Sequence, residues 1–285
     1  MTNDTIKGLV TLLRLPYWMM SGGLSIITAF AISKDMLAPQ MVLLVFFSMA
    51  FITSAGFALN DYFDRESDAV IKPKRPIPSG ALSLKQVVAI SSSLFAVGLI
   101  FALLISLISF VILLIDTILL IVYSAYIKRK SGLAANILVG LLVGTAFIYG
   151  EAAVFQRVSL ISLSLYPICF GTIGGNILRD ILSFEGDSKV GYPTLPQRVG
   201  NAGSAKIASV FFSVTAILAP LPFLLNFFSI YYATPVLLWS AILLYSSFRL
   251  VTLPATVENV RKYERLITMS MILLILSLLL EALIG

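Results

Sequence analysis

The residues of this chain most able to do chemistry are amide and acidic side chains at the end of an apolar segment. Asn60, Asp64 and Asp68 are spaced at i, i+4 and i+8, so on a helix they lie along one face. Two bare carboxylates about 4 Å apart repel by about 4 kcal/mol at an effective dielectric near 20. Mg²⁺ removes that repulsion, because it binds carboxylate and amide oxygens and leaves positions for phosphate. We therefore predict that these three residues, in a first motif at 60–68, are magnesium ligands.

A second motif, at 176–187, lies in the other half of the chain. Asp180 and Asp187 are seven residues apart and share a face if their helix persists through Gly186, a weak helix former. Asn176 precedes Asp180 by four residues, which repeats the amide-to-acid spacing of the first motif. Two acidic groups suit two metal ions that bridge a diphosphate. The predicted catalytic residues are Asp64, Asp68, Asp180 and Asp187. All four, together with Asn60, are predicted metal ligands.

A structural alternative exists for both motifs. Each could be a solvated helix end whose carboxylates pair with nearby Arg65, Lys72 and Arg75. The helical spacing, the leading asparagine and the presence of two such groups favour metal binding for the first motif.

The elements that must position these motifs are membrane helices. Hydrophobic residues make up 59% of the 285 positions and charged residues 12%, and the mean hydropathy is +0.99, which excludes an ordinary soluble domain. Apolar runs of about 20 residues predict transmembrane helices. Nine are expected, at 15–32, 40–59, 86–105, 108–126, 133–154, 160–178, 206–228, 231–250 and 266–284.

The distribution of basic residues predicts the orientation of the chain. With the N-terminus inside and a break near 106–109, only Lys34 and Arg157 of the 20 basic residues fall outside, as the positive-inside rule requires. We expect an integral protein of the cell membrane with its N-terminus and both motifs in the cytoplasm and its C-terminus outside. The net charge of +6 then describes a rim that attracts lipid headgroups and anionic substrates, not nucleic acid.

Several kinds of site are excluded by composition. The chain has no histidine and a single cysteine, Cys169, which removes imidazole metal sites, histidine-activated nucleophiles and internal disulfides. No nucleotide-binding glycine pattern occurs either. Carboxylate, amide, lysine, arginine and tyrosine side chains remain.

The two motifs open the two longest connections, at about 59–85 and 179–205. Each connection begins with acids and ends in Pro and Gly turn signals, so both are expected to be functional loops. The duplication predicts one all-helical domain, residues 1–285, with two pseudo-repeated halves around a central cavity.

At these residues the sequence resembles the UbiA superfamily of intramembrane prenyltransferases. The first motif matches its N-D-x-x-D-x-x-x-D pattern, and residues 72–80 match the K-P-x-R-P-I-P-S-G run of branches acting in archaeal ether-lipid and chlorophyll synthesis. The resemblance implies nine spans and Mg²⁺-dependent transfer from geranylgeranyl diphosphate to the hydroxyl of geranylgeranylglyceryl phosphate. Chlorophyll synthesis and aromatic prenyl transfer to quinone precursors are the alternatives within the family.

Two positions depart from the family pattern. Ser183 stands where the second motif of the family has its middle acid, and Ile71 replaces a frequent asparagine. Glu185 or water could complete the second metal site, or that metal could bind more weakly. Tyr123, Tyr126, Lys128 and Asn136 resemble polar residues that follow the fourth helix of the family.

Basic and tyrosine side chains near the motifs are candidate substrate ligands. Partners for the diphosphate are Lys74, Arg75, Lys128, Arg179 and Lys189, for which simple positive-inside anchors are the alternative. Arg14 could hold the phosphate of a glycerol-phosphate acceptor, or snorkel to the interface. Tyr123 and Tyr126 could assist the acceptor hydroxyl, or belong to an interfacial belt.

Two further features fall within the predicted spans. Asp116 is expected mid-membrane, where an acid costs about 2.5 to 3.5 kcal/mol, and either faces the cavity or bonds to a neighbouring helix. Gly140 and Gly144 form a G-x-x-x-G pattern that favours close helix packing. The rival from another class is a transporter or a non-catalytic lipid-binding protein, which would have its acids at the bilayer centre instead of at the helix ends.

Overall fold

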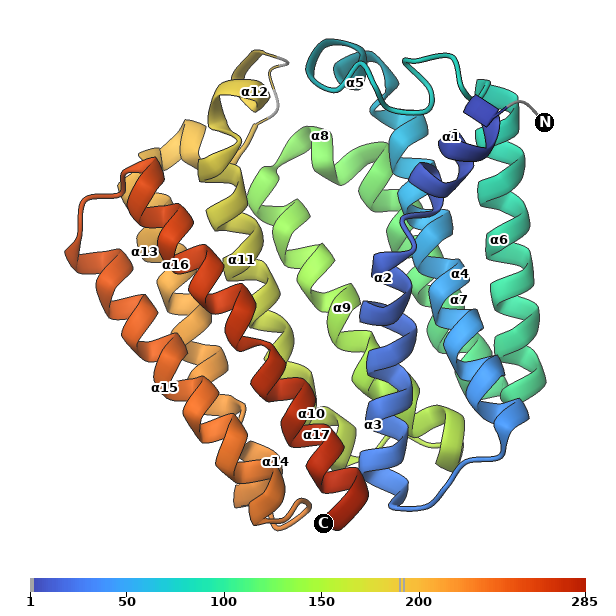
Figure 1. The fold of residues 1–285 in the computed structure, drawn as a ribbon, viewed down its shortest axis with the longest axis vertical. Coiled ribbons are helices and arrows are strands. Elements are labelled where there is room, and N and C mark those ends of the chain that lie inside the picture. Colours follow the sequence, from blue (N-terminus) through green and yellow to red (C-terminus); the bar gives the residue numbers. More distant parts are fainter. Residues whose placement is uncertain (1–2, 190, 192) are drawn as a thin grey trace.

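The computed structural model describes residues 3–189, 191 and 193–285 of the chain. The described residues are almost entirely helical, and nine helical stretches among them are long and apolar enough to cross a membrane. This confirms the predicted all-helical integral membrane fold (Figure 1).

The first half of the chain contains five of these stretches. The first is built from α1 (Asn3–Leu13), α2 (Pro16–Trp18), the π-helical turn η1 (Met19–Gly23) and α3 (Leu24–Ser33). The next two are α4 (Pro39–Phe63), followed by the short α5 (Arg65–Ile71), and α6 (Leu84–Ile105). The fourth joins α7 (Leu107–Val122), the π-helical turn η2 (Tyr123–Ile127) and α8 (Lys128–Lys130), and the fifth is α9 (Gly132–Phe155).

The second half contains four. The sixth stretch joins α10 (Leu160–Leu165), the 3₁₀ turn η3 (Tyr166–Ile168) and α11 (Cys169–Leu182), and the short α12 (Phe184–Lys189) follows it. The seventh is α13 (Leu195–Leu218) with α14 (Leu221–Leu224), and the eighth is α15 (Ile230–Thr252). The ninth joins α16 (Val257–Ser270) to α17 (Ile272–Ile284).

The predicted break between the third and fourth spans lies at Ser106. This residue is extended, with φ −168° and ψ 160°, and its hydroxyl accepts a hydrogen bond from the Ser109 amide. It therefore caps the start of α7.

Some predicted boundaries were wrong, because hydropathy ends a span at its first charged residue whereas the backbone helix continues. The connection expected at 179–205 is largely helical: α11 extends to Leu182, α12 follows, and α13 begins at Leu195. The ninth span was expected to start at 266, but its helix starts at Val257 and carries basic side chains through its first turns.

Packing of the helices follows chain order around the bundle. Successive long helices contact one another from α4 to α17, and α17 also packs on α3, which closes the ring. Most buried apolar residues form two clusters, one around α11, α13 and α15 and one around α4, α6, α7 and α9. The first cluster lies mainly in the second half of the chain but includes Ala31 of α3 and Phe147 of α9, and the second cluster lies in the first half.

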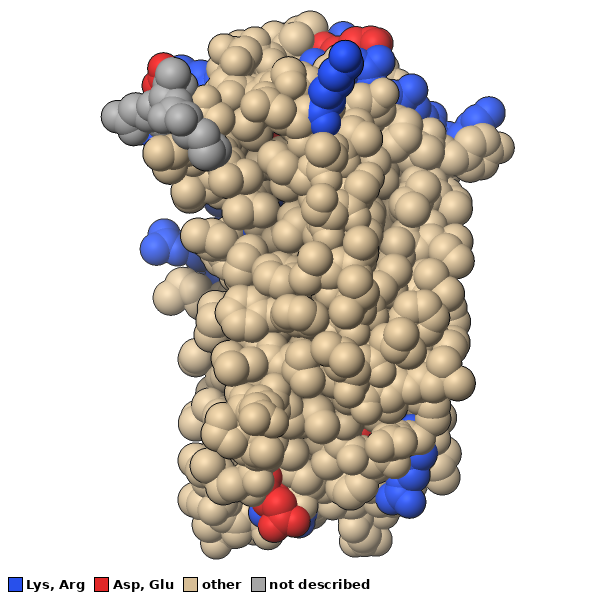
Figure 2. Space-filling model, turned by 90° about the vertical axis from the view of Figure 1, so that its right-hand side faces the viewer, with Lys and Arg blue, Asp and Glu red and all other residues tan. Residues whose placement is uncertain are grey.

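Charged side chains gather at the ends of the bundle. On the face seen in Figure 2, most charges lie near the two ends; further Lys or Arg side chains protrude at the left edge above mid-height, and a broad uncharged band lies below them. Both motifs lie at one end, with α5 and α12 side by side there (Figure 1); we call it the motif end. The N-terminal helix α1 is also at the motif end, and the chain finishes at the opposite end.

Buried acids outside the motifs have structural partners. Asp116 on α7 is buried and accepts a hydrogen bond of 3.2 Å from the Thr145 hydroxyl on α9, so it bonds to a neighbouring helix. The buried Glu281 carboxylate accepts hydrogen bonds from the Ser229 amide and hydroxyl at the start of α15. The Ser229 amide at the start of α15 and the buried Glu281 carboxylate therefore each have a hydrogen-bond partner.

The two glycines of the G-x-x-x-G pattern lie where α9 contacts the sixth span. A Cβ atom at Gly140 would lie 2.3 Å from Cγ1 of Ile173, and one at Gly144 would lie 2.8 Å from Cβ of Cys169. Only glycine therefore allows this close approach.

We predict that Gly140→Ala lowers the stability of the protein by about 1 to 3 kcal/mol, because the added methyl group overpacks the contact with Ile173. Thermal unfolding of the purified protein in detergent measures the change. Gly175→Ala on α11 is the matched control, since a Cβ there meets nothing within 4 Å. Equal melting temperatures for the two variants would contradict the packing account.

Candidate active site at the motif end

The two motifs share one local architecture. In the first, α4 ends at Phe63, Asp64 follows, and α5 begins at once; in the second, α11 ends at Leu182, Ser183 follows, and α12 begins. Aligning these junctions pairs an Asp61, Asp64, Asp68 series with an Asp180, Ser183, Asp187 series. The repeat therefore starts at Asp61 and not, as the sequence suggested, at Asn60.

Helical hydrogen bonding continues through the first junction. The Asp64 amide donates to the Asn60 carbonyl at 2.9 Å, and the Asp68 amide donates to the Asp64 carbonyl at 2.8 Å. The side-chain amide of Asn60 also donates to Oδ2 of Asp64 at 2.9 Å. Asn60 and Asp64 are thus held together at the end of a membrane helix.

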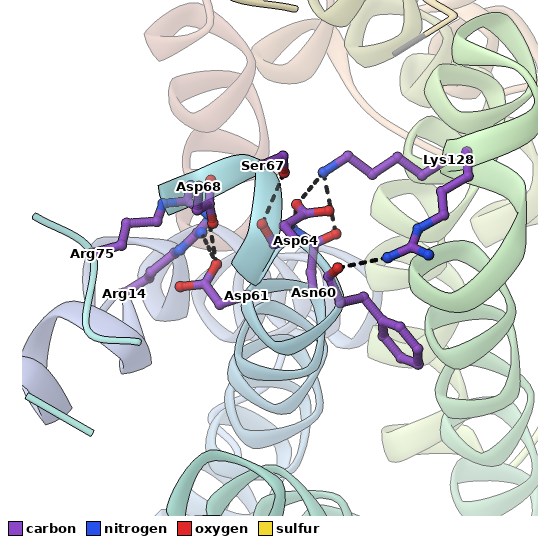
Figure 3. A network of polar contacts seen from close by, with 10 residues as sticks. Arg14, Asn60, Asp61, Asp64, Ser67, Asp68, Arg75 and Lys128 are labelled. Carbon is purple, nitrogen blue, oxygen red and sulfur yellow. Dashed lines mark hydrogen bonds and ion pairs between the residues drawn. The ribbon is translucent and has the colours of Figure 1, made fainter. Parts of the chain in front are cut away.

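Lys128 approaches this pair from the side opposite Arg14 and Arg75 (Figure 3). Its Nζ forms an ion pair with Oδ2 of Asp64 and lies 3.4 Å from Oδ1 of Asn60. Asp64 is 5% exposed, so its carboxylate needs a cationic partner. Lys128 directly follows the π-helical turn η2, a distortion often found at functional sites.

The other acids of the first motif face two arginines (Figure 3). Oδ1 of the buried Asp61 accepts from Nη2 of Arg14 at 2.7 Å and from Nη1 of Arg75 at 2.9 Å. Nη1 of Arg75 also bonds to Oδ2 of Asp68 at 2.5 Å. Arg75 thus joins Asp61 to Asp68, while the guanidinium of Arg14 lies 4.4 Å from the ring centroid of Phe57.

In the second motif both acids accept hydrogen bonds from neutral groups. Oδ2 of Asp180 accepts from the Asn136 side chain on α9 at 2.7 Å, and Oδ2 of Asp187 accepts from the Ser183 hydroxyl at 2.5 Å. Asp180 also interacts electrostatically with Asp187 and with Lys128. Lys128 therefore lies within electrostatic reach of both motifs.

Contacts to carbonyl groups surround the segment that carries Lys128. The Arg129 guanidinium donates to the Phe63 carbonyl of the first motif at 2.7 Å, and the Gly132 amide donates to the Pro193 carbonyl, beyond the second motif, at 2.9 Å. The two short helices α5 and α12 lie next to each other, because a Cβ at Gly186 would lie 3.5 Å from Cγ2 of Ile71. The ends of the two motifs are therefore neighbours.

Basic side chains from outside the first motif crowd around its acids. Partial removal of the Lys72 ammonium from water, together with the nearby Arg75, lowers the pKa of Lys72 below its usual range; Asp68 opposes this shift, and Lys128 and Arg14 add to it. Such crowding of cations favours an anionic ligand.

The donor atoms suit magnesium but do not form a complete cage. Carboxylate and amide oxygens are the ligands Mg²⁺ prefers, and Asn60 and Asp64 already direct two of them at one cation. Within the described residues, no three His, Cys, Asp or Glu side chains converge on one point. A magnesium ion here would need further oxygens from substrate or water.

Some predicted ligands lie away from these contacts. Tyr126 is 60% exposed, with the Lys130 ammonium 5.4 Å from its ring centroid. The Arg179 guanidinium pairs with Glu264 of α16 and is 57% exposed. Lys74 and Lys189 are exposed, whereas Tyr123 is half-buried at the start of η2. Their substrate roles stay predictions.

Two residues contribute more to the geometry than their sequence position indicated. Asp61 collects two arginines, and Asn136 holds Asp180. Both were visible in the sequence, as an extra acid in the first motif and as an amide in the fifth span. Their partners lie 14 to 47 residues away in the chain, so local spacing could not assign them.

Comparison with known proteins gives the same picture along most of the chain. The sequence model of the UbiA prenyltransferase family matches residues 22–278. Digeranylgeranylglyceryl phosphate synthase of Natronomonas pharaonis is 35% identical over 225 residues, which cover 79% of this chain and 80% of the relative. The synthase of the same name from Halobacterium salinarum is 30% identical over 264 residues, 93% of this chain and 95% of the relative.

Solved structures share the fold. A structure from work on digeranylgeranylglyceryl phosphate synthase in membranes has a TM-score of 0.84 and 27% identity, and the match covers 98% of this chain and 99% of that chain. A UbiA homologue from Archaeoglobus fulgidus, bound to DMAPP and Mg²⁺, has a TM-score of 0.72 at 20% identity over 93% of this chain and 98% of that chain.

We predict that Arg75→Ala lowers the stability of the protein by about 2 kcal/mol, because Asp68 then loses a charged partner in a buried site. Adding Asp68→Asn should restore part of the loss, since the orphaned charge disappears. Thermal unfolding in detergent measures both effects.

Arg65→Ala is the control for this pair, because its partner Glu66 is exposed and such surface pairs contribute about 0 to 1 kcal/mol. The buried ion pair would not contribute to stability if Arg75→Ala were as stable as this control. The same would follow if the double variant were less stable than Arg75→Ala.

Proposed function

The chain belongs to the UbiA prenyltransferase family of membrane enzymes, and from this premise we propose its substrates and the roles of its residues. The enzyme transfers a geranylgeranyl group from geranylgeranyl diphosphate to the hydroxyl of geranylgeranylglyceryl phosphate. The observation that carries this proposal is the similarity to digeranylgeranylglyceryl phosphate synthases over nearly the whole of both chains.

In the proposed reaction the bond between the allylic carbon and the diphosphate oxygen breaks, and pyrophosphate leaves with the electron pair. The acceptor hydroxyl oxygen bonds to the same carbon and passes its proton to the released pyrophosphate or to water, which gives an ether. Magnesium, when bound, neutralises the leaving pyrophosphate. Its proposed ligands are Asn60, Asp64, Asp68, Asp180 and Asp187, and the related protein with bound DMAPP and Mg²⁺ supports the choice of metal.

Basic side chains of this chain hold the diphosphate in the proposal. Lys128 lies within reach of both motifs, and Arg75 with Lys72 adds positive charge beside the first. Charge-assisted hydrogen bonds from such groups to phosphate oxygens position the donor and favour the departing anion. The apolar helices below the motifs exclude water from a carbocation-like transition state.

Arg14 is the proposed ligand for the acceptor phosphate. Asp61 and the Phe57 ring fix its guanidinium at the break between α1 and α2, and Arg14 retains donors that these contacts do not use. Its place beside the first motif would bring the acceptor headgroup next to the donor diphosphate.

The motif end is proposed to face the cytoplasm, where both water-soluble diphosphate and magnesium are available. The support is the asymmetry of basic residues, of which only Lys34 and Arg157 fall outside.

We predict that Asp64→Asn reduces prenyl transfer by at least about 100-fold, because a metal ligand that stabilises the leaving group is lost. The assay incubates purified protein with labelled geranylgeranyl diphosphate, Mg²⁺ and geranylgeranylglyceryl phosphate, hydroxybenzoate or chlorophyllide. Only the glycerol-phosphate acceptor should give a labelled ether. Unchanged activity of a folded Asp64→Asn variant would remove the metal assignment, and transfer to another acceptor would replace the proposed substrate.

We predict that Arg14→Gln raises the KM for the acceptor about tenfold and leaves the KM for the donor unchanged, since one charged phosphate contact is worth about 1.5 to 3 kcal/mol. Steady-state kinetics with each substrate varied in turn separates the two constants. Arg249→Gln, a matched arginine at the end of α15, should change neither. An equal rise in both constants for Arg14→Gln would mean that Arg14 only stabilises the fold.

A further inference from the structure

The ammonium of Lys128 lies between side-chain oxygens of Asn60 and Asp64. Nζ contacts Oδ2 of Asp64 and lies 3.4 Å from Oδ1 of Asn60. These are the same two oxygens that a magnesium ion would bind in the proposed function. A single carboxylate oxygen cannot hold an ammonium and a metal ion at full strength, so the two cations compete.

Cationic side chains of the protein already outnumber the buried acids of the first motif. Three carboxylates face four cations; the acids are Asp61, Asp64 and Asp68, and the cations are Arg14, Lys72, Arg75 and Lys128. A divalent ion that entered alone would add positive charge to a group that has a surplus of it. Its binding is therefore opposed by the surrounding charge.

Acidic side chains alone do not complete a metal site here. No three His, Cys, Asp or Glu side chains of the described residues converge, so an octahedral ion at Asp64 would take further oxygens from neutral groups, water or substrate. A diphosphate provides both the missing oxygens and the negative charge that the site lacks.

A displaced Lys128 has a ready destination. The Lys128 ammonium interacts electrostatically with Asp180 of the second motif as well as with Asp64 of the first, so it lies on the side of the first motif that faces the second. The Lys128 side chain is only 24% exposed, and a partly buried ammonium favours an anionic partner. A diphosphate oxygen would replace the Asp64 carboxylate as that partner.

We infer that Lys128 makes magnesium binding and diphosphate binding depend on each other, by releasing Asp64 to the metal only when a diphosphate accepts the ammonium. This inference rests on the proposed function. Lys128 then couples the binding of the metal to the binding of the diphosphate, in addition to contacting the diphosphate itself. By thermodynamic linkage each ligand must raise the affinity for the other by the same factor.

The test measures metal binding without catalysis. Mn²⁺ is titrated into the full-length protein in detergent, without diphosphate, and the free ion is followed by electron paramagnetic resonance. Lys128→Gln, which removes the competing charge, should bind Mn²⁺ at least tenfold more tightly than the unchanged protein. Lys128→Arg, which keeps the charge, should bind it as weakly as the unchanged protein.

Lys130→Gln is the matched control, because Lys130 lies in the same short helix but its ammonium is 5.4 Å from the Tyr126 ring centroid. This variant should bind Mn²⁺ like the unchanged protein. The inference would be overturned if Lys128→Gln bound Mn²⁺ no more tightly than the unchanged protein. It would also be overturned if Lys130→Gln gained as much affinity for Mn²⁺ as Lys128→Gln.

A second measurement needs no variant and remains decisive if Lys128→Gln does not fold. Equilibrium dialysis of labelled inorganic pyrophosphate against the unchanged protein should show an affinity at least tenfold higher with Mg²⁺ than without it. An affinity that Mg²⁺ does not change would overturn the inference. Two negative results together would remove the proposed metal site itself. These are no binding of Mn²⁺ alone to Lys128→Gln, and no binding of Mn²⁺ with pyrophosphate to the unchanged protein.

Discussion

Pairing of buried charge governs the motif end of this protein. Asp61, Asp64 and Asp68 are all buried at the end of a membrane helix, where an unpaired carboxylate is too costly to retain. Each has a cationic partner: Lys128 serves Asp64, and the two arginines serve Asp61 and Asp68. The backbone around the first motif must therefore place these cationic side chains next to the acids.

The fold meets that need with local irregularities placed on regular helices. A π-helical turn precedes Lys128, and a break with φ +50° at Arg14 separates α1 from α2. The second motif lacks the middle acid, and Ser183 instead donates to Asp187. The two halves therefore differ in charge: the first is rich in ion pairs, whereas the second relies on hydrogen bonds from Asn136 and Ser183. A diphosphate between them would meet two chemically distinct sides.

Much of the architecture was predictable from the sequence, because its cause is local. Apolar runs long enough to span a bilayer define the helices, and Ser106 divides the third from the fourth by a simple cap. The two motifs were also visible, since acids at helical spacing are rare in so apolar a chain. Their junctions were not, because the helix of the sixth span continues past Leu178, the expected end of the span, to Leu182, as long as its backbone hydrogen bonds are made.

The partners of the acids could not be predicted, because they come from distant parts of the chain. Lys128 is 64 residues from Asp64, and Arg14 is 47 residues from Asp61. Only packing of the helices brings them together. The same packing turned Arg179 towards Glu264, although its sequence position beside Asp180 had suggested a substrate contact.

In the proposed function both motifs act on one diphosphate through divalent metal. Anomalous diffraction from crystals grown with Mn²⁺ and pyrophosphate would locate both ligands. We expect a manganese peak at the Asp64 carboxylate, with the pyrophosphate between the first motif and Asp180 and the Lys128 ammonium bound to it. A manganese peak away from both motifs, or a pyrophosphate that touches only one of them while Lys128 stays on Asp64, would contradict it.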